Sequence, residues 1–202
     1  MSDPAGALAR ARNKRIVVIA AVILLTGAVV AGILVATSGS SSPKPTAGSP
    51  STNAPRPSAT VNGTTVQAVS VSELRALPAA VGHPVYWAGP RAGTTYELTR
   101  SPDGRVYVRY LSGGAKVGSP LPDFLTIGTY VVPNAATAVR AAASQPGAVR
   151  VPVPGGVGFY NTARPTSVYF AYPSSNVQVE TYDPSAAVAR RLVETGAITP
   201  VG

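Results

Sequence analysis

Few residues of this chain have the types and spacing that chemistry requires. Its only histidine, His83, lies in a Gly-His-Pro turn, and no serine stands in a G-x-S-x-G motif, so a Ser-His-Asp triad is not indicated. The absence of cysteine excludes disulfides and thiolate metal ligands. No histidine or acidic spacing is typical of a metal site, and no glycine motif is typical of a nucleotide-binding loop. We therefore predict no catalytic residue, no metal and no cofactor, and a protein that is not an enzyme.

Two carboxylates leave one catalytic alternative open. Glu97 and Glu180 both lie in the middle of predicted strands. A pair of carboxylates is the machinery of glycoside hydrolysis, so these two residues would suit a hydrolase or transferase of the cell envelope. The simpler interpretation is that both are outward-facing strand residues.

Aromatic residues interleaved with arginines give the best indication of binding. Tyr86 and Trp87 lie a few residues before Arg91 in a region of short predicted strands. Aromatic rings with arginine are typical of surfaces that bind glycans, anionic polymers or proteins, although rings of this kind also form cores. We predict a binding site at Tyr86, Trp87 and Arg91, with an envelope protein or a cell-wall polymer as its partner.

Helical segments are expected at three places in the region 66–202. Ser70 and Glu73 form a predicted capping box for a short helix, which we expect Pro78 to end. An alanine-rich run at 134–144 is the second helix. The third is expected to begin with Asp183 as its N-cap and to close near a glycine.

Strands are expected between and around these helices. Each run alternates or is rich in aromatic and β-branched residues. The predicted strands cover 84–89, 94–100, 105–111, 124–131, 157–160, 167–172 and 177–182. In 167–172 apolar side chains occupy both faces, as expected of a central strand that is covered on both sides.

An internal repeat indicates how these elements group. The segment 125–138 resembles 177–189: each reads as a strand, then Thr-Tyr, a proline and an alanine-rich helix start. Matching offsets further upstream align Tyr96 with Tyr169. We therefore predict one α+β domain of mostly antiparallel strands with two to three helices, built from two related strand–helix units.

The N-terminal part predicts a membrane anchor. Residues 16–36 carry no charge and would reach roughly 31 Å as a helix, which matches the hydrocarbon core of a bilayer. The head, 1–15, is basic, and the next cation after the apolar run is Lys44. By the positive-inside rule the N-terminus is cytoplasmic and the rest is extracytoplasmic. A retained signal-anchor is favoured over a cleaved signal because the run is long.

A linker is predicted between this anchor and the domain. Residues 37–65 are rich in Ser, Pro and Thr and lack aromatic residues, which is typical of a disordered spacer. Within it, Asn62-Gly63-Thr64 also fits an N-glycosylation sequon.

The charge distribution argues against one class of partner. The net charge of +9 is spread over the head, the linker and the domain, so nucleic-acid binding is not expected. The fifteen-residue head is also too short for an output domain, so a sensing role would require a membrane complex that this chain joins as an accessory subunit.

Five segments carry a resemblance to a group of proteins. They are PVYWAGP (84–90), YELTR (96–100), RVYVRYL (105–111), LTIGTY (125–130) and QVETYDPS (178–185). Together they make the chain similar to uncharacterised single-pass membrane-anchored proteins of high-GC actinobacteria. The resemblance covers most of the predicted domain. It implies an envelope location and no particular activity.

Overall fold

A computed structural model describes residues 58–202. The predicted head, the predicted transmembrane helix and the linker up to residue 57 lie outside the described residues. Among residues 58–202, no helix combines the length and the apolar character that crossing a bilayer demands.

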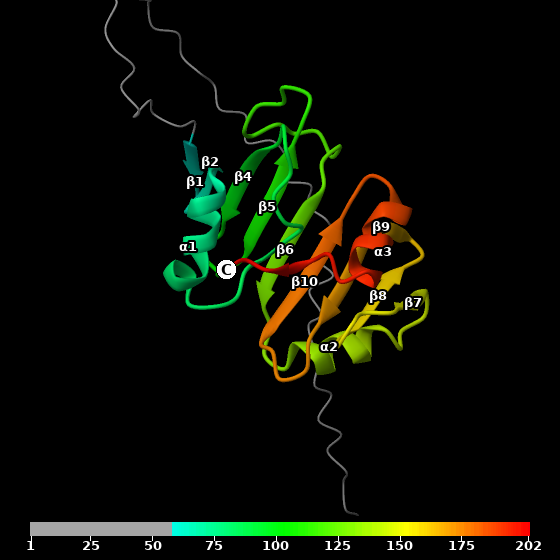
Figure 1. The fold of residues 1–202 in the computed structure, drawn as a ribbon. Helices are drawn as coiled ribbons and strands as arrows, with labels where there is room; N and C mark the ends of the chain where they lie inside the picture. Colours follow the sequence, from blue (N-terminus) through cyan, green and yellow to red (C-terminus); the bar gives the residue numbers. More distant parts are fainter. Residues whose placement is uncertain (1–57) are drawn as a thin grey trace, which may run out of the picture.

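One large antiparallel sheet organises the described residues (Figure 1). It has nine strands, and every neighbouring pair is antiparallel. Across the sheet the order is β1 (Ser58–Val61), β2 (Thr64–Val69), β4 (Thr95–Arg100), β5 (Val106–Leu111), β6 (Thr126–Val131), β10 (Val177–Tyr182), β9 (Arg164–Ala171), β8 (Val157–Asn161) and β7 (Ala148–Val151). A separate two-stranded ribbon pairs β3 (Tyr86–Trp87) with β11 (Thr199–Pro200). With three helices present, the predicted α+β class with mostly antiparallel strands is confirmed.

The helices cover opposite faces of this sheet. We call the face that carries Val108 and Phe170 the front face, and the face that carries Tyr169 and Glu180 the rear face. On the front face, α1 (Val71–Val81), the β3–β11 ribbon and α3 (Ala186–Glu194) pack into the main core (Figure 1). On the rear face, α2 (Ala135–Ala142) packs against β8 and β9 in a second cluster. Strand β9 is therefore covered on both sides, as its sequence predicts.

The domain begins earlier than expected. The predicted linker extends to residue 65, but residues 58–65 form β1 and the start of β2, so that boundary is wrong. Asn62 and Gly63 connect the two strands with φ of 50° and 75°, the left-handed pair of a two-residue hairpin turn. The Asn-Gly dipeptide that fits a glycosylation sequon is therefore a turn.

Helix α1 confirms one predicted end and corrects the other. The Ser70 hydroxyl accepts the Glu73 N–H at 3.2 Å, and the Glu73 carboxylate accepts the Ser70 N–H at 2.7 Å, so the capping box is present. Pro78 does not end the helix, which continues to Val81 and closes at Gly82 with φ of 75°. The missing Pro78 N–H costs one helical bond, but the last turn still closes, since the Gly82 N–H donates to the Pro78 carbonyl at 2.9 Å and Val81 packs against the front core.

Helix α3 starts later than expected. Its N-cap is Ser185, while the Asp183 carboxylate accepts the Ser185 N–H at 2.8 Å in the preceding turn. Asp183 is therefore not the N-cap, although its side chain fixes the backbone that leads into the helix.

The arrangement of strands bears on the predicted repeat. Gly128 of β6 pairs with Glu180 of β10, and these are the two positions that the repeat aligns. The order β4-β5-β6-β10-β9-β8 is also symmetric about that pair. That symmetry would relate β4 to β8, whereas the sequence offsets align Tyr96 on β4 with Tyr169 on β9, so the two assignments disagree. Since α2 and α3 lie on opposite faces, the two-unit origin stays a prediction.

Candidate binding site

The three residues of the predicted site do not form a surface together. Tyr86 and Trp87 are only 6% and 5% exposed, because β3 pairs with β11 and packs into the front core. The Tyr86 ring stacks on Tyr172 at 5.9 Å between centroids. Arg91 is exposed, and its guanidinium lies 5.1 Å from the centroid of the Tyr110 ring. The two predicted aromatic anchors thus belong to the core, and only Arg91 is accessible.

Glu97 is a buried structural carboxylate. The Arg109 Nη1 donates to its Oε1 at 2.6 Å, and the Gly118 N–H donates to its other oxygen. Arg109 also donates to the Ser119 and Leu121 carbonyls at 3.1 and 2.9 Å. The buried ion pair therefore ties the β5–β6 connection to the rear face of the sheet.

Glu180 lies in a separate polar cluster on the same face. Its carboxylate accepts hydrogen bonds from the hydroxyls of Tyr130 and Tyr169, the latter at 3.0 Å. Burial, followed by the Glu180 charge, raises the pKa of both tyrosines above the ordinary value of 10.0. Both tyrosines therefore remain protonated donors to Glu180 at neutral pH.

These contacts overturn both interpretations of the two carboxylates. Strands β5 and β6 separate β4 from β10, so Glu97 and Glu180 are about 14 Å apart across the sheet. Glycosidase pairs are about 5 to 9.5 Å apart, so the carboxylate-pair mechanism is wrong for these two residues. Their assignment as outward-facing strand residues is also wrong, because both are buried.

His83 is likewise occupied by backbone contacts. Its Nδ1 lies 2.9 Å from the Pro84 carbonyl oxygen, and its Nε2 lies 3.2 Å from the Gly104 carbonyl oxygen. The ring therefore joins the α1–β3 connection to the β4–β5 turn, which is a structural role.

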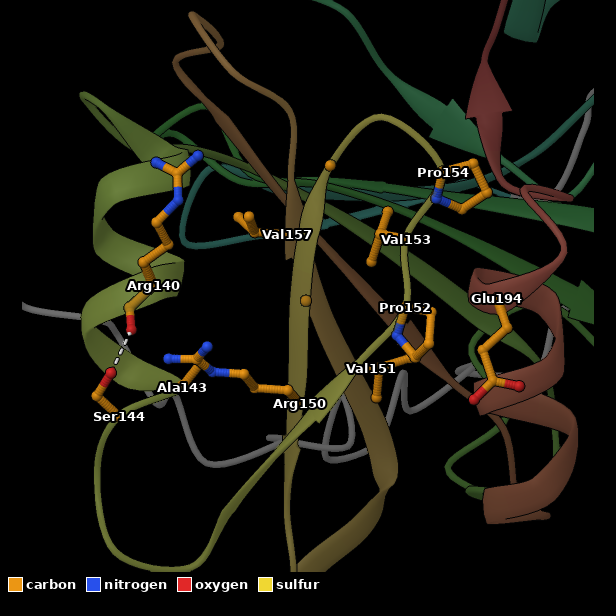
Figure 2. Close-up of a pocket in the computed structure, with 12 residues that line it drawn as sticks. Arg140, Ala143, Ser144, Arg150, Val151, Pro152, Val153, Pro154, Val157 and Glu194 are labelled. Carbon is orange, nitrogen blue, oxygen red and sulfur yellow. Dashed lines mark hydrogen bonds between the residues drawn. The ribbon is translucent and has the colours of Figure 1, made fainter.

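An open pocket lies at the other end of the sheet, beside β7 (Figure 2). It is bounded by α2, β7, β8, the β7–β8 connection and the end of α3, and its volume is about 610 Å³. Pockets of this size hold small ligands. Much of its surface is apolar and comes from Val151, Pro152, Val153, Pro154 and Val157.

Two glycines at the start of β8 shape the wall of this pocket. A Cβ on Gly158 would lie 2.6 Å from Val153 Cγ2, and one on Gly156 would lie 2.9 Å from Val153 Cγ1. The absence of side chains at both positions lets Val153 rest directly on β8. Strand β7 is not among the strands predicted from the sequence. The run of prolines with paired glycines beside a predicted strand was the sequence signal that could have indicated this pocket.

Two arginines supply the charge of the pocket. Arg140 comes from the last turn of α2 and Arg150 from β7. Both are exposed, and within residues 58–202 neither forms an ion pair. Ser144 lies beside them, but its hydroxyl donates to the Arg140 carbonyl at 3.1 Å. Glu194 lies on α3, which packs on the opposite face of the sheet from α2 and these arginines (Figure 2).

This arrangement is suited to holding an anion. Guanidinium groups donate several N–H bonds to carboxylate or phosphate oxygens, and these charge-assisted bonds are among the strongest available. The described pocket residues include no histidine, cysteine or lysine. No group of three or more metal-ligating side chains exists within residues 58–202.

No protein-family model, no curated protein and no solved structure matches this chain. The resemblance to membrane-anchored actinobacterial proteins therefore stays a prediction. What the pocket binds is inferred from its own residues.

Proposed function

We propose that this protein is a single-pass membrane-anchored binding module of the cell envelope, and that it holds an anionic ligand in the pocket beside β7. One observation carries the proposal: two arginines without ion pairs in the described chain line the same open pocket. An exposed cation pair on a concave surface is available to a partner, whereas Arg109, which is paired and buried, is not.

The envelope location is supported by the N-terminal sequence. An uncharged run of twenty-one residues follows a basic head, which favours a membrane span with the remainder outside. The envelope offers anionic ligands of several kinds, including acidic polymers and lipids, so the compartment and the charge of the pocket agree.

The binding part of the proposal is tested with two matched double variants of the full-length chain in neutral-lipid nanodiscs. Arg140→Gln/Arg150→Gln removes both pocket cations. Arg75→Gln/Arg191→Gln removes two exposed cations that do not line the pocket. Both variants therefore have the same net charge.

The readout is the affinity for fluorescent inorganic polyphosphate. We expect the pocket variant to lose about tenfold or more, and the control to change less than about twofold. Equal losses in the two variants would show a nonspecific charge effect and overturn the proposed site.

The location is tested by protease treatment of intact cells. Externally added protease is expected to digest residues 58–202 without lysis. Protection in intact cells followed by digestion after lysis would place the domain in the cytoplasm, and the envelope assignment would fail.

A further inference from the structure

We infer that the anionic partner of this pocket is an extended segment of another protein, which pairs as an additional strand with the outer edge of β7 and places an acidic side chain beside Arg150. The inference rests on the proposed function for the acidic group. It adds the class of the partner and the way in which the partner's backbone is held.

Strand β7 is an open edge of the sheet (Figure 1). Within residues 58–202 it pairs with β8 alone. Val149 is 37% exposed, and Arg150 is also exposed. The outer side of an edge strand presents unpaired N–H and C=O groups, to which an extended peptide can add as a further strand.

The register of β7 shows which of its backbone groups face outward. The Thr162 N–H donates to the Gly147 carbonyl at 2.8 Å, so these two residues form a hydrogen-bonded pair. Because such pairs alternate along an antiparallel ladder, the backbone groups of Ala148 and Arg150 face away from β8. The Ala148 N–H already binds the Gln145 carbonyl at 3.1 Å. Arg150 therefore offers both its N–H and its C=O, and Ala148 offers its C=O.

The side chains of β7 specify the composition of the added strand. Arg150 points to the α2 side, where Arg140 also lies, whereas Val149 and Val151 point to the α3 side (Figure 2). Side chains of an added strand alternate between the same two sides. The residue opposite Arg150 is therefore expected to be acidic, and its two neighbours, which lie beside the valines, are expected to be apolar.

An extended segment also agrees with the two-sided shape of the pocket. The lining residues lie on both faces of the β7–β8 hairpin, with the arginines on one face and most of the apolar side chains on the other. A compact ligand on one face would meet only one of these groups. A strand along the edge of β7 meets both, because its side chains point alternately to the two faces.

A second copy of β7 is a less suitable partner. Two β7 edges joined antiparallel into one continuous sheet would bring the Arg150 side chains of both copies to the same face on adjacent strands, with both Arg140 side chains on that face as well. Like charges opposite one another in a sheet are destabilising. Charge complementarity therefore favours an acidic segment over self-association.

A synthetic peptide tests the acidic position. The probe is rhodamine-labelled Gly-Thr-Val-Glu-Val-Thr-Gly with blocked termini, and fluorescence anisotropy measures its affinity for the full-length protein in phosphatidylcholine nanodiscs. Replacing its Glu by Lys should weaken binding about tenfold, since attraction to Arg150 becomes repulsion. Arg150→Glu in the protein should weaken binding of the original peptide similarly and restore binding of the Lys peptide, which a general loss of folding would not do.

Methylation of the peptide backbone separates strand addition from charge attraction alone. An N-methyl group on the peptide's Glu blocks the N–H that binds the Arg150 carbonyl, and the affinity should fall about tenfold or more. An N-methyl group on either Val lies on the outer edge of the added strand and should change the affinity less than about threefold. All these peptides have the same charge.

Two exposed valines supply a matched pair of protein variants. Val149→Ser removes an apolar contact from the edge strand β7, and Val61→Ser makes the same change on β1, the edge strand at the other side of the sheet. Only the first is expected to weaken binding of the peptide, by about threefold.

Two outcomes would overturn the inference, and they differ. Suppose the peptide fails to bind, or neither the Lys replacement nor methylation of its Glu weakens binding, while Arg140→Gln/Arg150→Gln still abolishes polyphosphate binding. Strand addition then fails, and the anion site stands with a polymer as its ligand. If Arg140→Gln/Arg150→Gln changes the binding of neither peptide nor polyphosphate, the inference and the proposed function both fail.

Discussion

The carboxylate of Glu180 shows how single residues stabilise the rear face. It is buried, and within residues 58–202 it accepts two tyrosine hydroxyls and has no cationic partner. A buried carboxylate without donors is costly, so both hydroxyls are needed. The Tyr130 ring reaches Glu180 by lying across Gly128, where a Cβ would be 2.9 Å from the hydroxyl.

Gly128→Ala is therefore expected to lower the free energy of unfolding by about 2–3 kcal/mol, because the displaced ring withdraws a donor from a buried charge. Urea denaturation followed by Trp87 fluorescence measures the change. Tyr130→Phe is the companion variant: it keeps the ring and removes only the hydroxyl. A Gly128→Ala protein within about 0.5 kcal/mol of the parent would show that the ring does not depend on the glycine.

Three buried tyrosines, two of them the partners of Glu180, are expected to make the protein less stable in alkali. Burial is the largest cause that raises the pKa of Tyr110, Tyr130 and Tyr169 above 10.0. Above that pH the unfolded chain releases these protons while the folded chain retains them. The stabilisation is therefore complete below pH 10 and is lost as the pH rises above it.

Urea unfolding between pH 8 and 11.5 checks this expectation. The free energy of unfolding should be level at first and fall above about pH 10, with tyrosinate absorbance of the buried rings appearing only together with unfolding. Complete titration of all nine tyrosines in a protein that keeps its folded fluorescence would contradict it.

At the level of elements, the β5–β6 connection depends on one ion pair. The side chains of Arg109 and Glu97 are 7% and 0% exposed and are joined at 2.6 Å. Those of Arg105 and Asp103, joined at 2.7 Å, are 26% and 55% exposed. Because the nitrogen–oxygen distances of the two ion pairs are similar, burial is the main difference between them.

Arg109→Met is expected to cost about 3–5 kcal/mol, since it leaves the Glu97 charge buried without its partner. Arg105→Gln, the control, should cost less than about 1 kcal/mol, because water screens that pair. Chemical denaturation of both variants provides the comparison. Similar losses in the two proteins would mean that burial does not determine the value of the pair.

Elements whose causes are local were predictable from the sequence. The capping box at Ser70 and the alternation in 105–111 require only near neighbours, and both are present. The end of α1 was not predictable in this way. Pro78 is a local stop signal, but Val81, in the turn beyond it, packs against the front core and carries the helix past the proline.

The site depended on contacts that local patterns do not contain. Tyr86 and Trp87 have the composition of a binding surface, and only the pairing of β3 with the C-terminal β11 shows that they are covered. The pocket joins α2 and β7, which follow one another in the sequence, to α3, which begins only at Ala186. Because β7 was not predicted, nothing in the sequence placed Arg140 and Arg150 on one surface.

Across the whole molecule, the start of the described chain and the pocket lie at opposite edges of the sheet. The described chain begins at β1, and the pocket borders β7, eight strand spacings away, or about 38 Å along the sheet. If residues 16–36 anchor the protein as proposed, the sheet itself carries the pocket away from its point of attachment.

The C-terminal segment closes the front face of this sheet. Ile198 and Val201 are buried in the main core, and the Val201 N–H donates to the Val85 carbonyl at 2.7 Å. Strand β11 pairs directly with Trp87. Figure 1 shows the segment crossing in front of the central strands.

Deletion of residues 198–202 is therefore expected to cost about 3–6 kcal/mol, the value of two large buried side chains, and to shift Trp87 emission to the red as the ring meets water. Removal of Gly202 alone, which is exposed, is the matched control and should change neither quantity. Fluorescence spectra and denaturation curves of both truncations measure the effect. An unshifted emission maximum after the longer deletion would mean that other elements cover Trp87, and the closing role of the C-terminal segment would be refuted.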